Sequence, residues 1–69
     1  MDRSESARPE HPVKFWREKH RLTVRGLAAL ADVSHSMVSE IENGTKTGSV
    51  ETLRKLAHAL KVELDALVG

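Results

Sequence analysis

The apolar residues of this chain recur at the spacing of short helices, and no segment shows the alternation typical of a strand. Pro12 suits the first position of a helix, because its missing amide costs nothing there, and this helix extends to about His20. Three later helices each follow a hydroxyl residue that can cap free amides, namely Thr23, Ser34 and Ser49. The apolar positions of the four helices are Val13 and Trp16; Leu27, Ala28, Leu30 and Ala31; Val38 and Ile41; and Val50, Leu53, Leu56, Ala57 and Leu60. A short fifth helix that closes the core is predicted from Val62, Leu64, Leu67 and Val68.

The third helix, between Ser34 and Gly44, has an unusually narrow apolar side. Only Val38 and Ile41 are clearly apolar, and Gly44 can take the left-handed conformation that ends a helix. At about 100° per residue, the side away from these two is polar and consists of His35, Ser36, Ser39, Glu40 and Asn43. Such a helix is poor for building a core and suits a groove lined with hydrogen-bond donors and acceptors. The pattern therefore indicates DNA as a partner.

The second and third helices are joined by a three-residue link, Asp32 to Ser34, which is the arrangement of a helix-turn-helix. Ala28 is small where the two helices approach each other, and Val33 can insert the turn into the core. Glu42 falls close to the buried edge of the third helix, so its carboxylate needs a partner. Arg17 on the first helix is the natural candidate.

Composition narrows the class of protein. The 69 residues make one small domain (12–69) behind a polar arm (1–11) that we expect to be flexible, and the absence of cysteine excludes disulfides and thiolate metal sites. The net charge of +1 conceals an uneven distribution, since residues 13–25 carry five bases and one acid, whereas residues 26–44 carry three acids and no base. No signal peptide or membrane-spanning apolar run is visible, so a soluble, cytoplasmic protein is expected.

Many positions between Val13 and Val68 match one known family in order and spacing: Val13, Trp16, Arg17, Leu22-Thr23, Leu27-Ala28, Val33-Ser34, Val38-Ser39, Ile41-Glu42-Asn43-Gly44, Ser49, Glu51-Thr52-Leu53, Ala57, Leu60, Val62 and Leu64-Asp65. The chain thereby resembles the helix-turn-helix family of phage repressors and Cro proteins, the XRE family. The resemblance implies an all-α, compact, five-helix, lambda-repressor-like domain that regulates transcription. Such domains usually bind palindromic operator DNA as homodimers, with the third helix (about 35–43) in the major groove.

The resemblance also implies roles for individual residues. The base readers fall at His35, Ser36, Met37, Ser39 and Glu40. The phosphate contacts fall at Thr23, Ser34, Asn43, Thr45, Lys46 and Thr47. The family also has an arginine–glutamate pair at the positions of Arg17 and Glu42, in agreement with the helical geometry. Hydroxyls and amides suit phosphate oxygens, His35 and Ser36 can donate or accept at base edges, and Met37 can touch a thymine methyl.

Several residues depart from the family pattern. Val24 replaces a common phosphate-binding glutamine, and Gly26 stands where a glutamate often completes a capping box. Glu40 places a carboxylate on the expected DNA face, where it either accepts a hydrogen bond from cytosine N4 or repels phosphates. Glycines common in the turns of the family are replaced by Arg21, Asp32 and Lys61.

Two classes of function remain open from the sequence. The first is a sequence-specific transcriptional regulator, and the second is a protein-interaction module, antitoxin or controller protein with weak DNA affinity. We expect any dimer to form through the domain itself, around Leu64, Leu67 and Val68 together with part of the fourth helix. No enzyme, cofactor or metal is expected, since Asp32, Ser34 and His35 lie too close together for a catalytic trio and the histidines lack metal-site spacing: His11, His20, His35 and His58.

Overall fold

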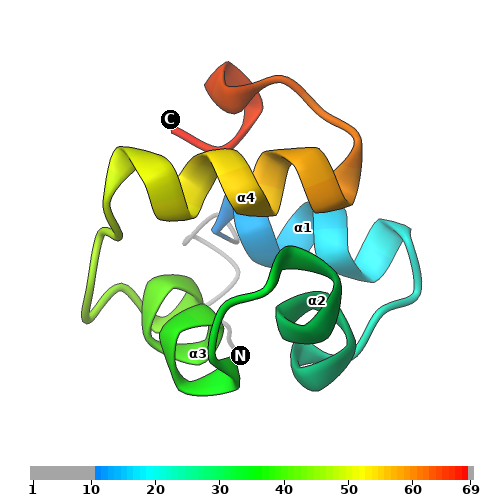
Figure 1. The fold of residues 1–69 in the computed structure, drawn as a ribbon, viewed down its shortest axis with the longest axis horizontal. Helices are drawn as coiled ribbons and strands as arrows, with labels where there is room; N and C mark the ends of the chain where they lie inside the picture. Colours follow the sequence, from blue (N-terminus) through cyan, green and yellow to red (C-terminus); the bar gives the residue numbers. More distant parts are fainter. Residues whose placement is uncertain (1–10, 69) are drawn as a thin grey trace, which may run out of the picture.

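The computed structural model describes residues 11–68, in which four α-helices are joined by short turns (Figure 1). The elements in chain order are α1 (Pro12–Lys19), α2 (Val24–Ala31), α3 (His35–Asn43), α4 (Val50–Leu60) and a short 3-10 helix, η2 (Leu64–Ala66). The arm expected over residues 1–11 lies outside the described residues except for His11. That histidine caps α1, because its Nδ1 accepts a hydrogen bond of 3.1 Å from the amide of Val13.

The three hydroxyl residues predicted as N-caps have that role. The side-chain oxygen of Thr23 accepts from the amide of Gly26 at 2.9 Å. Ser34 accepts from the amide of Met37 at 3.1 Å, and Ser49 accepts from the amide of Thr52 at the same distance. Each bond satisfies one of the free amides of a first turn, so the starts of α2, α3 and α4 are fixed by local chemistry.

All four helices end in the same way, with a residue in the left-handed conformation. These residues are Arg21 (φ 58°), Asp32 (φ 59°), Gly44 (φ 82°) and Lys61 (φ 60°). The residue that follows each donates its amide to the carbonyl five positions back at 3.0 Å, which reverses the chain over the last turn. Three of these following residues, Leu22, Val33 and Val62, are apolar and pack against the core. Only the end of α3 is different, because Thr45 follows Gly44.

The expectation of a fifth α-helix is wrong. The C-terminal segment forms one 3-10 turn of three residues, Leu64–Ala66, whose N-cap Glu63 provides no side-chain hydrogen bond. Lys61 ends α4 in the left-handed conformation, and the extended backbone of Glu63 (φ −72°, ψ 152°) separates it from this turn. Leu67 nevertheless reaches the core and is 2% exposed, so the segment closes the fold as predicted without being an α-helix.

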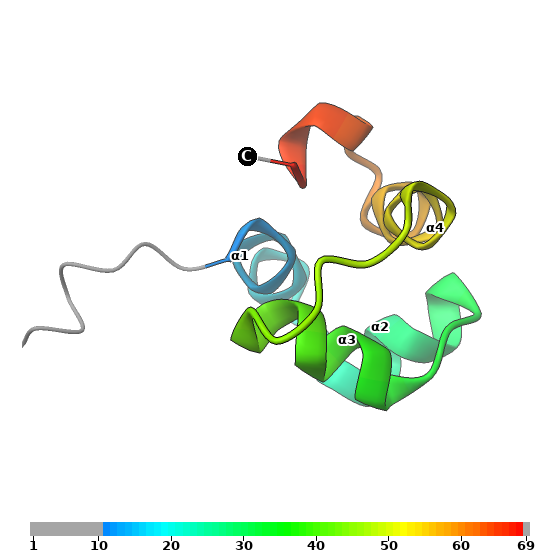
Figure 2. The same ribbon diagram turned by 90° about the vertical axis from the view of Figure 1, so that its left-hand side faces the viewer.

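The core lies between α4 and the other three helices (Figures 1 and 2). Every α-helix contributes to it, and its buried apolar residues are Val13, Leu27, Ala28, Ala31, Val38, Ile41, Leu53, Leu56, Ala57, Leu60 and Leu67. Figure 2 shows α2 and α3 at the edge of the molecule that lies opposite the C-terminal turn. None of the helices in residues 11–68 combines the length and the apolar character required to cross a membrane.

Candidate nucleic-acid interface

The candidate interface is the exposed surface of α2 and α3, which are packed against each other. The link between α2 and α3 is held by the amide of Val33, which donates to the carbonyl of Ala28 at 3.0 Å. Ala28 is 4% exposed, so its small side chain allows the two helices to approach closely. Val38 and Ile41 are completely buried and pack the inner side of α3 against the core. The opposite side of α3 is thus held outward by packing and by both of its caps.

The expected base readers do not all lie on this outward side. His35 and Ser36 are exposed, and Ser39 and Glu40 are partly exposed beside them. Met37 is half-buried and packs against the core, so less of its side chain is available to a ligand. The structure therefore brings four of the five side chains to one accessible face.

The expected phosphate contacts form two groups. Thr23 and Ser34 lie at the starts of α2 and α3, where their oxygens are occupied as caps. A hydroxyl that accepts a hydrogen bond retains its own proton for donation, so both side chains can still donate to a phosphate oxygen. The second group lies at the end of α3 and in the loop after it, and it consists of Asn43, Thr45, Lys46 and Thr47, all of which are exposed.

Within the second group, Thr45 is attached to α3 rather than free to bind a ligand. Its hydroxyl donates to the carbonyl of Glu40 at 3.1 Å, and its amide donates to the same oxygen at 3.0 Å. The amide of Lys46 makes a third contact with that carbonyl, at 3.3 Å. The ammonium of Lys46 lies 3.6 Å from the carboxylate of Glu40. This connection was not predicted from the sequence, in which only the left-handed end at Gly44 was recognisable.

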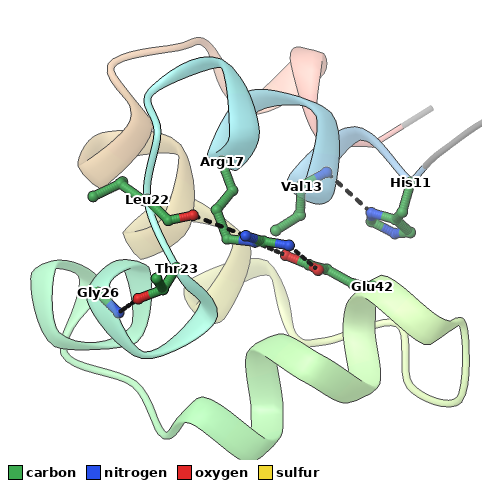
Figure 3. A network of polar contacts seen from close by, with 7 residues as sticks. All are labelled: His11, Val13, Arg17, Leu22, Thr23, Gly26 and Glu42. Atoms are coloured by element: carbon green, nitrogen blue, oxygen red, sulfur yellow. Dashed lines mark hydrogen bonds and ion pairs between the residues drawn. The ribbon is translucent and has the colours of Figure 1, made fainter.

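Arg17 and Glu42 form the ion pair expected from the helical geometry (Figure 3). Arg17 Nε donates to Glu42 Oε2 at 2.7 Å, and Nη2 donates to Oε1 at 3.1 Å. A third donor, Nη1, reaches the carbonyl of Leu22 at 2.8 Å. The two side chains are only 12% and 7% exposed. The pair therefore ties α1 and the following turn to α3 inside the fold, away from the accessible face.

The departures from the family pattern at the start of α2 have a structural basis. Thr23 caps the helix without a reciprocal side chain at Gly26 (Figure 3). A Cβ atom at Gly26 would lie 3.2 Å from the oxygen of Thr23, which is a tight contact. Val24 is half-buried and packs against the core, so this position stabilises the fold and offers no polar group to a ligand.

Two further features were not predicted. His20 lies at the end of α1, and its Nε2 is 2.7 Å from the carbonyl of Leu60 at the end of α4. Because a carbonyl only accepts, this ring nitrogen donates and joins the two helix ends.

A cavity of about 410 Å³ also lies between the loop after α3 and the C-terminal segment, with Leu53, Leu67 and Val68 in its lining. Within residues 11–68, no cluster of three histidine or acidic side chains is placed to hold a metal ion.

Two capped helices joined by a three-residue link, the second with a polar outward face, define a helix-turn-helix domain. Comparison with known proteins agrees. A helix-turn-helix family model matches residues 13–67, and the chain belongs to this family.

Two relatives illustrate the similarity. The chain is 42% identical over 53 residues to the HTH-type transcriptional repressor RghR of Bacillus subtilis (strain 168), a match that covers 75% of this chain and 39% of RghR. The chain thus spans about two fifths of that relative. Its fold is also similar to the N-terminal DNA binding domain of SinR from Bacillus subtilis, with a TM-score of 0.78 and 29% identity over 83% of this chain and 84% of the other.

Proposed function

We propose that this protein is a sequence-specific DNA-binding transcriptional regulator that places α3 in the major groove of a palindromic operator. The observation that carries the proposal is the polar face of α3, which is held outward by the buried Val38 and Ile41. The names of RghR and the SinR domain support it, since they describe a repressor and a DNA-binding domain. The proposed activity is binding in the cytoplasm, and it needs neither a cofactor nor a catalytic group.

On this proposal, the residues divide into two roles. His35, Ser36, Ser39 and Glu40 read base edges, with Met37 at the margin of the face. Backbone amides and hydroxyls at the starts of α2 and α3 bind phosphates, together with the group that follows α3. These phosphate contacts are Thr23, Ser34, Asn43, Thr45, Lys46 and Thr47, of which Thr45 contributes least because its donors are engaged.

A homodimer is part of the proposal, because a palindromic operator requires two copies related by a twofold axis. The C-terminal segment is the best-suited surface for this contact. Val68 is 46% exposed and borders the cavity that Leu53 and Leu67 help to line. This segment lies on the side of the molecule opposite α3, so a contact there leaves the polar face open (Figure 2).

The test is a binding titration with an operator fragment from the promoter region of the gene itself, repeated at several salt concentrations. The double variant Ser36→Ala, Asn43→Ala is expected to lower affinity by at least about tenfold, since it removes one proposed base contact and one proposed phosphate contact. His58→Ala, on the exposed side of α4, is the matched control and should bind like the unmodified protein. Unchanged binding by the double variant would refute the assignment of the face.

A second candidate is a protein-interaction module, such as an antitoxin or a controller protein, with the same fold and weak DNA affinity. The observation that favours it is the absence of any lysine or arginine within α3. Capture of one stoichiometric protein partner, with no retention on DNA at low salt, would support this candidate over the first.

A further inference from the structure

Three hydrogen bonds join the start of the loop after α3 to one residue, Glu40. The carbonyl of Glu40 accepts from the amide of Thr45 at 3.0 Å, from the hydroxyl of Thr45 at 3.1 Å and from the amide of Lys46 at 3.3 Å. At the ends of the other three helices, the residue equivalent to Thr45 is apolar and packs against the core. At this end, polar contacts therefore fix the backbone of Lys46 within one side-chain length of the Glu40 carboxylate.

The ammonium of Lys46 uses this position to face Glu40. Its Nζ is 3.6 Å from Oε1 of Glu40, and the two side chains are 55% and 44% exposed. An exposed pair of this kind adds little to stability, so its consequence is electrostatic rather than structural. Glu42, the other acid of α3, is paired with Arg17. Both carboxylates of α3 thus have a cationic partner from outside the helix.

We propose that Glu40 is a specificity-determining residue for a base that presents an amino hydrogen in the major groove, and that Lys46 is its positioning residue. This inference rests on the proposed function. A carboxylate only accepts hydrogen bonds, so it selects cytosine, whose major-groove edge is the N4 amino group. Guanine offers the acceptors N7 and O6 and thymine offers O4, and a carboxylate is repelled by each of them. Adenine is intermediate, because its amino group lies beside the acceptor N7.

Lys46 makes this selection compatible with DNA binding. Without a cation beside it, the Glu40 carboxylate repels the phosphates on either side of the groove. The Lys46 ammonium, 3.6 Å from Oε1, compensates the negative charge of Glu40. The other carboxylate oxygen, Oε2, is then the one that accepts from a base. The proposal gives Lys46 this role in addition to its proposed phosphate contact. Loss of a phosphate contact alone weakens binding to all sequences and reduces the salt dependence by about one ion.

The test is selection of duplexes from random-sequence DNA by the full chain, followed by sequencing and titration of the selected site. The unmodified protein is expected to enrich a motif with cytosine at one fixed position in each half-site. Glu40→Ala should relax that position alone, and Glu40→Gln should shift it toward adenine, because an amide both donates and accepts. For both variants, discrimination at that position should fall by about tenfold.

Variants of Lys46 distinguish a positioning role from a phosphate contact. Lys46→Met should weaken both the cytosine preference and the affinity. Lys46→Arg keeps the positive charge and should retain both. The double variant Glu40→Gln, Lys46→Met should bind more tightly than Lys46→Met alone, because no carboxylate then needs compensation. Lys55→Met, on the exposed side of α4, removes the same charge and should leave the motif unchanged.

Three outcomes would overturn the inference. An unchanged motif in both Glu40 variants would show that Glu40 reads no base. A uniform loss of affinity in Lys46→Met that is not relieved by Glu40→Gln would show that Lys46 acts only as a phosphate contact. In both cases a motif enriched by the unmodified protein would still support the proposed function. Failure of the unmodified protein to enrich any motif would overturn the proposed function and this inference together.

Discussion

Glu40 and Glu42 are two carboxylates separated by one residue on the same helix, and their environments are opposite. The offset of two positions rotates them by about 200° around α3. Glu42 turns inward and receives two hydrogen bonds from Arg17, with both side chains no more than 12% exposed. Glu40 turns outward and meets Lys46 at 3.6 Å in a largely exposed pair. Residue type alone therefore does not determine what an acid on this helix does.

The difference lies in how each pair connects the chain. Arg17 also donates to the carbonyl of Leu22, so the inner pair joins α1, its following turn and α3 at one point (Figure 3). Removal of one member leaves the other charge largely shielded from solvent without the opposite charge beside it, which is costly. The outer pair is local, since Lys46 and Glu40 are six residues apart, and either member can be solvated when the other is lost. The inner pair maintains the fold, and the outer pair modifies the accessible face.

The largest expected effect comes from removing the inner carboxylate. Glu42→Ala should lower the free energy of unfolding by about 3 kcal/mol, because the Arg17 side chain is only 12% exposed and its guanidinium loses the carboxylate. The melting temperature of a domain of this size should then fall by about 15 °C. Urea unfolding followed by far-UV circular dichroism measures the change. Glu40→Ala is the matched control and should lie within about 0.5 kcal/mol of the unmodified protein.

If Glu42→Ala does not fold, Glu42→Gln provides the same information. It keeps the shape of the side chain and one hydrogen-bond acceptor while removing the charge, so the loss should be smaller and measurable. Equal changes at positions 40 and 42 would contradict the distinction between the inner and outer pairs.

A smaller change, which raises rather than lowers the free energy of unfolding, is expected at the turn after α1, whose Leu22 carbonyl accepts from Arg17. Arg21 precedes Leu22 and has a φ of 58°, a conformation that costs a residue with a Cβ atom about 1 kcal/mol or more. Arg21→Gly should raise the free energy of unfolding by about 0.5 to 1 kcal/mol, as the relief of this cost exceeds the greater freedom of glycine in the unfolded chain.

Asp32→Gly is the control for the Arg21 variant, since Asp32 has φ 59° but aspartate tolerates this conformation better. Its gain should be smaller, and thermal unfolding of the two variants compares them directly. A loss of stability in Arg21→Gly would show that the arginine side chain, rather than the turn geometry, stabilises this corner.

Local signals account for the parts of the structure that the sequence predicted. Thr23, Ser34 and Ser49 precede their helices as caps, and the 100° rotation between residues placed Glu42 near the buried edge, where it contacts Arg17. Gly44 was recognisable as a left-handed end. Each of these features depends on residues within one or two helical turns, for which sequence spacing is sufficient.

The parts that could not be predicted depend on geometry between elements. The C-terminal leucines have helical spacing, yet their segment is a single 3-10 turn, because the packing of Leu67 determines its course. His11 was assigned to the arm, but it caps α1. The contact of Lys46 with Glu40 requires knowledge of how the loop folds back after Gly44, and no periodic pattern contains that information.

The smallest expected effect tests the comparison most directly. In a double-mutant cycle of Glu40→Gln and Lys46→Met, the coupling in the free energy of unfolding should be below about 0.5 kcal/mol at low salt. It should vanish near 1 M NaCl, where the screening length is about 3 Å. A cycle of Arg17→Met and Glu42→Gln should show a larger coupling that survives the added salt, because the inner pair is shielded from solvent ions. Urea is the suitable denaturant, since it leaves the ionic strength unchanged. If the coupling between Lys46 and Glu40 is as large and as salt-resistant as that between Arg17 and Glu42, the outer pair also stabilises the fold. The proposed difference in role between Glu40 and Glu42 would then be wrong.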